Sequence, residues 1–256
     1  MKLICKMLGG SHSYGLNTAA SDTDYRGVFL NTDVSTIIGL DRFEHQDLKS
    51  ATEDAFYWEL RHFLNLLRRG NTQGLELLFN QYWLEKDPVF QTLIDNRDQL
   101  VDTQAMFRSL KGYIHSERRF ANGERTGELG SKRKAALNAY GYSPKNVVQL
   151  LRLCWAGAYF FRYGSFPVNV KDADRTFWSN LYDIKTKPDQ FKKEELMAWV
   201  VRLETDMCRA FDSIKPSDHR QFNTEIANQL LVDAYMPILQ QSQNAPVAQL
   251  HSARIS

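Results

Sequence analysis

The chain has 256 residues, 43% of them hydrophobic and 24% charged, as expected for a globular protein with one large domain or two modest ones. A formal net charge of only +2 excludes the global basic field of a general nucleic-acid binder. Three scattered cysteines exclude a disulfide framework, and no apolar run approaches the roughly 20 residues of a membrane span, so we expect a cytoplasmic protein without a membrane partner.

The first part of the chain contains the predicted strands. Residues 3–8, 24–30 and 54–58 are short and rich in apolar or aromatic residues, and the first of them runs into a double glycine. Residues 35–40 fit either a short strand or a helical turn, and residues 43–50 are expected to be a polar connection. A small mixed sheet is therefore predicted in this part of the chain.

Helical periodicity dominates from residue 59 onward, and no convincing strand is predicted after Gln104. The clearest helix covers residues 143–164, with Ser143 as N-cap, Pro144 at the first helical position and Gly164 as terminator. The other predicted helices are residues 59–70, 72–84, 87–100, 104–121, 189–211 and 219–239. Residues 122–142 are expected to be a looser basic stretch.

These patterns predict an α+β fold: an α/β domain at residues 1–105, a helical domain at residues 106–240 and a flexible tail at residues 241–256. The boundary near residue 105 is soft, because no flexible linker marks it.

The stretch GGSHSYGLNTAASDTDYRGVF, residues 9–29, combines a pliable turn with a pair of acids. Asp22 and Asp24 are two residues apart at the start of a strand, so both carboxylates can face one cation. Magnesium prefers such oxygen ligands, and Asp54 at the start of a later strand is a candidate third acid. Gly10 and Ser11 can bring backbone N–H groups and a hydroxyl to an anion. The alternative is a solvated turn with local hydrogen bonds.

This ordered set resembles the signature of the DNA polymerase β-type nucleotidyltransferase superfamily. The stretch GSHSYGLNTAASDTDYRGV is similar to the Gly-Ser-x-x-Tyr-Gly and Ser-Asp-x-Asp-x-Arg-Gly-Val motifs of predicted bacterial and phage nucleotidyltransferases associated with RNA repair. DAFYWELRHFLNLLRRGN is similar to the segment that carries their third acid. The likeness covers the first 80 residues well and the helical half only loosely, through SPKNVVQLLRL.

The resemblance implies a palm-like domain followed by a helical bundle. It also implies that Gly10 and Ser11 hold a nucleoside triphosphate, and that Asp22 and Asp24 ligate Mg²⁺ or Mn²⁺. Asp54 would bind the second metal ion and help to activate the attacking hydroxyl.

Two other acids compete with Asp54 for the third position. Alternation along the strand favours Asp54, because Glu53 falls on the opposite face from Phe56 and Trp58. Glu59 is instead expected to cap the following helix.

Basic residues of the helical half are candidates for phosphate contacts. Lys145, Gln149 and Arg152 form one stripe of the helix at residues 143–164, and either a triphosphate or an acidic neighbouring helix could be its partner. Residues 108–134 contain eight lysines and arginines and three glutamates, a net charge of +5. This segment could guide RNA, or it could be a solvated face with ordinary ion pairs.

The predicted reaction is transfer of a nucleoside monophosphate from a nucleoside triphosphate to a hydroxyl, with RNA, for example a tRNA 3′ end, as one acceptor. The alternatives are transfer to a protein side chain or to a small molecule, and a catalytically silent nucleotide- or RNA-binding module. The retention of Asp22, Asp24 and Asp54 favours an enzyme.

Overall fold

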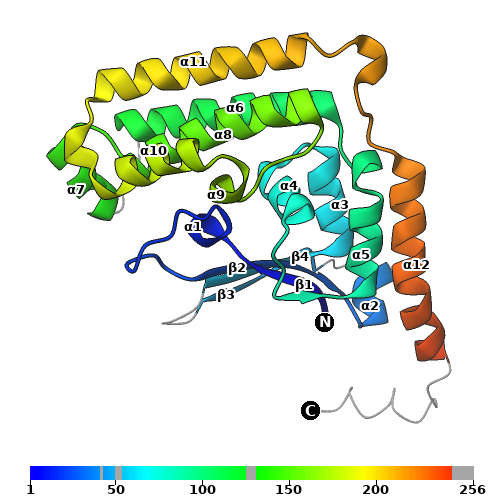
Figure 1. Ribbon diagram of the computed structural model, residues 1–256. Helices are drawn as coiled ribbons and strands as arrows, with labels where there is room; N and C mark the ends of the chain where they lie inside the picture. Colours follow the sequence, from blue (N-terminus) through cyan, green and yellow to red (C-terminus); the bar gives the residue numbers. More distant parts are fainter. Residues whose placement is uncertain (41–42, 50–53, 125–130, 244–256) are drawn as a thin grey trace.

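The computed structural model describes residues 1–40, 43–49, 54–124 and 131–243, and its first part forms a mixed sheet with helices packed above it (Figure 1). The strands are β1 (Lys2–Leu8), β2 (Asp24–Leu30), β3 (His45–Lys49), β4 (Asp54–Glu59) and β5 (Glu85–Lys86). Their order in the sheet is β3-β4-β2-β1-β5. The α+β fold class predicted from the sequence is confirmed.

Strand β2 pairs with β1 in the antiparallel direction and with β4 in the parallel direction. The parallel register places Asp24 opposite Asp54. Gly27 lies where β1 comes closest, since a Cβ atom there would be 2.2 Å from the carbonyl oxygen of Cys5. A glycine is therefore needed for this strand pairing.

The prediction of a polar connection at residues 43–50 was wrong, because β3 occupies most of this segment and pairs with β4. Its polar residues misled the prediction, yet polar side chains suit an edge strand, one of whose sides has no strand neighbour. The ambiguous segment 35–40 contributes to helix α2 (Val34–Ile38), and the Asp33 carboxylate caps it by accepting a hydrogen bond from Thr36 N at 3.0 Å.

The sheet is covered on one face by α1 (Gly10–Ser13), α3 (Leu60–Arg68), α4 (Thr72–Phe79) and α5 (Pro88–Asp95) (Figure 1). Glu59 caps α3 as expected: its carboxylate accepts a hydrogen bond from His62 N at 3.0 Å.

The second half of the described chain is helical. Its helices are α6 (Thr103–Asn122), α7 (Ser131–Tyr140), α8 (Pro144–Tyr163), α9 (Val170–Ala173), α10 (Arg175–Thr186), α11 (Lys193–Asp212) and α12 (Thr224–Gln243). Three short 3-10 turns are η1 (Arg97–Gln99), η2 (Pro188–Gln190) and η3 (Pro216–Asp218). No strand follows Gln104 in the part of the chain that the structure describes, as predicted.

Several predictions for this half need correction. Helix α7 lies in the stretch expected to be loose, and α9 and α10 were not predicted. Ser143 occupies the N-cap of α8, but its hydroxyl donates a hydrogen bond to Asn146 Oδ1 and does not cap the backbone. Helix α12 continues to Gln243, three residues into the expected tail, and residues 244–256 lie outside the described part, as does Glu53.

The buried core continues across residue 105, from Ile4 in β1 to Tyr235 in α12. Helix α12 packs back on α2, α3 and α5, and the Tyr235 hydroxyl donates a hydrogen bond to the buried Glu59 carboxylate. Cys5 and Cys154 are fully buried core residues, as predicted. None of the described helices combines the length and the apolar character needed to cross a membrane.

Two glycine substitutions test the packing at the sheet. Gly27→Ala should lower the free energy of unfolding by about 1–3 kcal/mol, because the added methyl group collides with the backbone of β1. Gly112→Ala, in the exposed middle of α6 with no atom within 4 Å of the new Cβ, should raise it by about 0.5–1 kcal/mol. Urea denaturation of both variants measures the difference. Equal changes in the free energy of unfolding of the two variants would contradict the close approach of β1 and β2 at Gly27.

Candidate active site

The turn after β1 packs closely against Asp24. Gly9 N donates a hydrogen bond to Asp24 O at 2.7 Å, and the Ser13 hydroxyl donates to Gly10 O at 2.9 Å. Gly10 has a φ of +55°, and a Cβ atom there would lie 2.6 Å from Asp24 Oδ2. A side chain at position 10 would therefore be strained and would displace the Asp24 carboxylate.

Three acids lie at the same edge of the sheet. Asp24 and Asp54 open the parallel strands β2 and β4 as direct register partners, and the exposed Asp22 lies two residues before Asp24. Within the described residues, none of these three carboxylates makes a hydrogen bond or an ion pair. Neighbouring carboxylates without a partner repel each other, and a cation between them relieves this repulsion.

The donor set fits a hard divalent cation, since all three groups are carboxylates and two of them line one cavity. The side chains are not gathered into a finished cluster: no three His, Cys, Asp or Glu side chains of the described residues are arranged to hold a metal ion. Asp54 does not line the cavity, although its strand position is next to Asp24.

A cavity of about 450 Å³ separates this turn from the helical half, within the range typical of small-ligand sites. Its sheet-side wall contains Gly10, Ser11, Asp22 and Asp24. Six of the residues on the helical side are Tyr113, Glu117, Arg133, Lys145, Gln149 and Lys185. Carboxylates and cationic side chains thus face one space, which suits a ligand that combines a metal ion with phosphates.

Of the residues predicted from the sequence, the structure brings Gly10, Ser11, Asp22, Asp24 and Lys145 to this cavity. Two larger hollows have volumes of about 760 and 810 Å³, and the larger one touches the same turn through His12, Ser13 and Gly15. We favour the smaller cavity as the candidate site, because Asp22 and Asp24 line it and line neither of the larger hollows.

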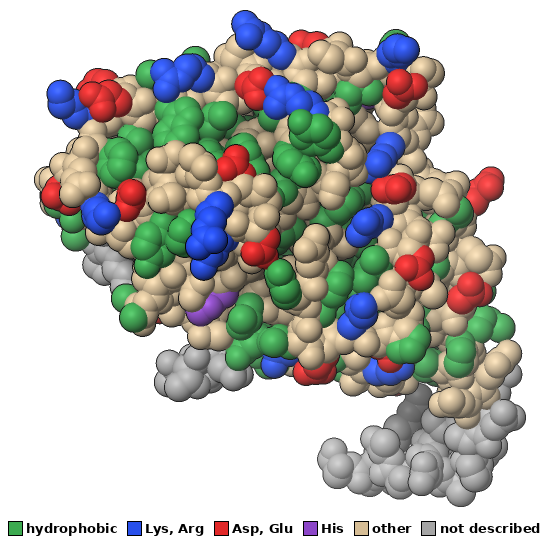
Figure 2. All heavy atoms as spheres, in the orientation of Figure 1, with side chains coloured by type: hydrophobic (Ala, Val, Ile, Leu, Met, Phe, Trp, Pro, Cys, Tyr) green, Lys and Arg blue, Asp and Glu red, His purple; other side chains and the backbone are tan. Residues whose placement is uncertain are grey.

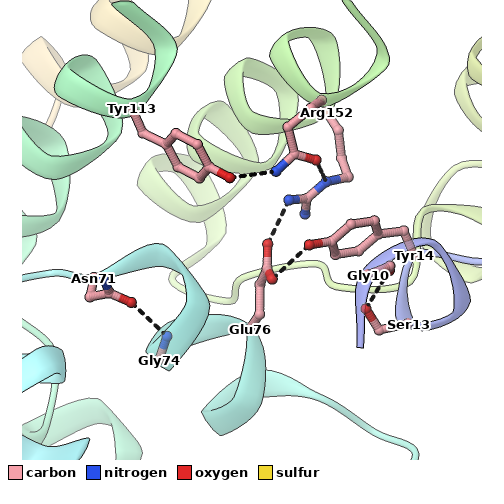
Figure 3. Close-up of polar contacts among 9 residues, drawn as sticks. Gly10, Ser13, Tyr14, Asn71, Gly74, Glu76, Tyr113 and Arg152 are labelled. Atoms are coloured by element: carbon pink, nitrogen blue, oxygen red, sulfur yellow. Dashed lines mark hydrogen bonds and ion pairs between the residues drawn. The ribbon is translucent and has the colours of Figure 1, made fainter. Parts of the chain in front are cut away.

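Arg152 does not line the cavity; it is fully buried behind the wall and takes part in a network of polar contacts there (Figure 3). Its Nη2 is 2.5 Å from Glu76 Oε1, and its guanidinium lies 3.6 Å from the centre of the Tyr14 ring. Tyr14 donates a hydrogen bond to Glu76 Oε2 at 2.8 Å. Arg152 Nε donates to Gln149 Oε1 at 3.1 Å, and Gln149 Nε2 donates to Tyr113 at 3.3 Å.

The partner of Arg152 is thus an acid on a neighbouring helix, one of the two alternatives that the sequence left open, and we omit Arg152 from the proposed phosphate ligands. Burial acts to lower the pKa of Arg152, but the Glu76 carboxylate outweighs it and the pKa is raised. Burial raises the pKa of the Tyr14 hydroxyl, so Tyr14 stays a proton donor to Glu76. The Arg152 guanidinium and the Glu76 carboxylate together hold Tyr14 at the cavity wall.

Sequence reasoning missed Tyr14, Glu76 and Lys185. A signal existed for two of them: Tyr14 belongs to the Gly-Ser-x-x-Tyr-Gly stretch, and Glu76 is a lone charge within the apolar run of α4. Lys185 lies on α10, a helix that was not predicted.

The basic segment at residues 108–134 is partly neutralised. Lys111 Nζ lies 2.6 Å from Glu204 Oε1 on α11, and Arg118 pairs with the same carboxylate. Arg125, Glu128 and the side chain of Lys132 lie outside the described residues. Figure 2 shows basic and acidic side chains interspersed on one face of the molecule, without a field of one sign.

Comparison with known families supports the picture from the site. Residues 1–233 match the model of RlaP, the RNA repair pathway DNA polymerase beta family. The match covers most of the chain, so the protein belongs to this family. A comparison with curated proteins finds no match.

The contact between Gly10 and Asp24 can be tested with a matched pair of glycines. Gly10→Ala and Gly141→Ala both place a side chain at positive φ, which costs about 1–2 kcal/mol. Only Gly10→Ala also collides with Asp24, because nothing lies within 4 Å of a Cβ at Gly141. Gly10→Ala should therefore be the less stable variant in thermal unfolding. Its extra cost should shrink when Asp24→Ala removes the carboxylate, and an unchanged cost would refute the contact.

The buried ion pair generates a second stability prediction. Glu76→Gln leaves the charge of Arg152 buried without a carboxylate, so the free energy of unfolding should fall by about 3–5 kcal/mol. Asp183→Asn is the control: it breaks the exposed pair with Lys187 and should cost less than about 1 kcal/mol. Chemical denaturation compares the two variants. Similar costs would show that the Arg152–Glu76 pair does not hold α4 to α8.

Proposed function

We propose that this member of the RNA repair pathway DNA polymerase beta family is a metal-dependent nucleotidyltransferase. It would transfer a nucleoside monophosphate from a nucleoside triphosphate to a hydroxyl and release pyrophosphate. The observation that carries the proposal is that Asp22 and Asp24 share one cavity with Gly10, Ser11 and Lys145, while Asp54 opens the neighbouring parallel strand.

The proposed division of labour follows the charges in the cavity. Gly10 and Ser11 would hold phosphate oxygens at the sheet side, where the turn has no bulky side chain. Lys145 would approach them from α8 as a mobile point charge, since it is exposed and makes no ion pair with a described residue.

Asp22, Asp24 and Asp54 would hold Mg²⁺ or Mn²⁺, because hard divalent cations prefer carboxylate oxygens as ligands. The bound ions would neutralise phosphate charge and increase the electrophilicity of the α-phosphorus. The Asp54 carboxylate would orient the acceptor hydroxyl and take up its proton as the new bond to phosphorus forms. Pyrophosphate would leave on the opposite side, toward Ser11 and Lys145.

We propose RNA as the acceptor class. The description of the family refers to an RNA repair pathway. Arg108, Arg119 and Lys134 are exposed and form no ion pair with a described residue, so they are free to approach a polyanion. Protein side chains remain the alternative acceptor, and a silent binding module is the alternative to an enzyme.

A labelling experiment with α-³²P nucleoside triphosphates tests the function. The purified protein is incubated with each of the four nucleotides, Mg²⁺ or Mn²⁺, and total RNA or total protein. Asp24→Asn should reduce transfer at least about 100-fold, because an amide is a poor ligand for a hard cation. Asp212→Asn, an exposed carboxylate at the end of α11, is the control and should leave transfer unchanged.

The outcomes separate the alternatives. Label in RNA that ribonuclease removes supports an RNA acceptor, whereas label in protein bands that resist ribonuclease supports modification of protein. Nucleotide binding without transfer in any condition indicates a silent module. Full transfer by a protein that carries both Asp22→Asn and Asp24→Asn would refute the proposed site.

A further inference from the structure

Lys185 is a cationic residue of the cavity whose position the sequence did not reveal. It lies in the last turn of α10 and is half-buried. Its Nζ donates a hydrogen bond to Leu16 O at 2.6 Å and a longer one to Ser21 Oγ at 3.4 Å. These two acceptors lie in the spacer, residues 14–21, which connects the glycine turn to Asp22.

Helices α9 and α10 also contact the first residues of the spacer. Trp178 Nε1 donates a hydrogen bond to Gly15 O at 2.5 Å, and Val170 N donates to Tyr14 O at 3.1 Å. The helical half therefore contacts both ends of the spacer between the turn and the acid pair. Of the three residues that donate these hydrogen bonds to the spacer, Lys185 is the charged one.

Lys145 faces the same space from α8. Neither Lys145 nor Lys185 has an ion-pair partner among the described residues. Glu117 also lines the cavity, but its carboxylate accepts a hydrogen bond from Asn146 Nδ2 at 2.6 Å. Burial, and then the positive charge of Lys145, lower the pKa of Lys185, as expected for two ammonium groups that lack a counter-ion.

We propose that Lys185 and Lys145 form a two-lysine clamp for the β- and γ-phosphates of the nucleoside triphosphate. The clamp rests on the proposed function and adds Lys185 to it as a phosphate-binding residue. An ammonium group has three N–H donors, and the contacts with Leu16 and Ser21 leave one of them for a phosphate oxygen. The polyphosphate supplies the counter-ion that the two lysines lack.

The competing explanation is that Lys185 only supports the spacer. The two roles differ in their dependence on the number of phosphates. A support role weakens the binding of all adenine nucleotides equally, because the distorted spacer affects the whole cavity. A clamp role weakens the binding of the triphosphate most and that of the monophosphate least.

The test measures binding of ATP, ADP, AMP and inorganic tripolyphosphate in Mg²⁺ by equilibrium dialysis. Lys185→Met should weaken binding of ATP and tripolyphosphate about tenfold or more, ADP less and AMP little, as expected for the loss of a charged hydrogen bond. Lys187→Met is the matched control, since Lys187 follows α10 directly and pairs with the exposed Asp183. Lys185→Gln keeps a donor for Leu16 but removes the charge, so it should reproduce the pattern if Lys185→Met does not fold.

Three results would overturn the clamp. Equal losses for ATP, ADP and AMP would show that Lys185 supports the spacer. If Lys145→Met weakens triphosphate binding while both Lys185 variants bind like Lys187→Met, the clamp fails and the proposed function stands. If the unmodified protein binds none of ATP, CTP, GTP and UTP in Mg²⁺, the proposed function fails, and the clamp fails with it.

Discussion

The position of β2 between β1 and β4 is the constraint on which the candidate site depends. Because β2 is antiparallel to β1 and parallel to β4, the end of β1 and the starts of β2 and β4 meet at one edge of the sheet. The glycine turn, Asp24 and Asp54 are therefore neighbours, although about 45 residues separate the turn from Asp54 along the chain. A shift of one residue in the β2–β4 register would turn one of the two carboxylates to the other face.

The second constraint is the attachment of the helical half to this edge. The buried pair between Arg152 and Glu76 connects α8 to α4, and Tyr14 joins both to the turn. Such a pair is not a strong source of stability by itself, but removing one partner is costly because a charge stays buried. The network therefore favours one arrangement of the two halves. That arrangement leaves a cavity between them, lined by acids from one half and lysines from the other.

The sequence predicted the parts of this structure that depend on local pattern. Strands β1, β2 and β4 and helix α8 follow from short apolar runs, helical periodicity and the end signals Pro144 and Gly164. The metal-binding roles of Asp22, Asp24 and Asp54 stay predictions. Strand β3 could not be predicted in the same way, because its stability comes from pairing with β4 and its residues are polar. Periodicity placed Arg152 on the stripe of Lys145, but only the tertiary structure shows that its partner is Glu76.

The charges of the cavity explain why a metal ion and a polyphosphate suit it better together than separately. Asp22 and Asp24 repel a free phosphate, and Lys145 and Lys185 repel a free cation. A nucleotide that carries a divalent ion presents positive charge to the acids and negative charge to the lysines. Under the proposed function, each component therefore increases the affinity for the other, and the coupling is reciprocal. Under the proposed clamp, Lys185 would add to this coupling, because it contacts both the polyphosphate and the segment that leads directly to Asp22.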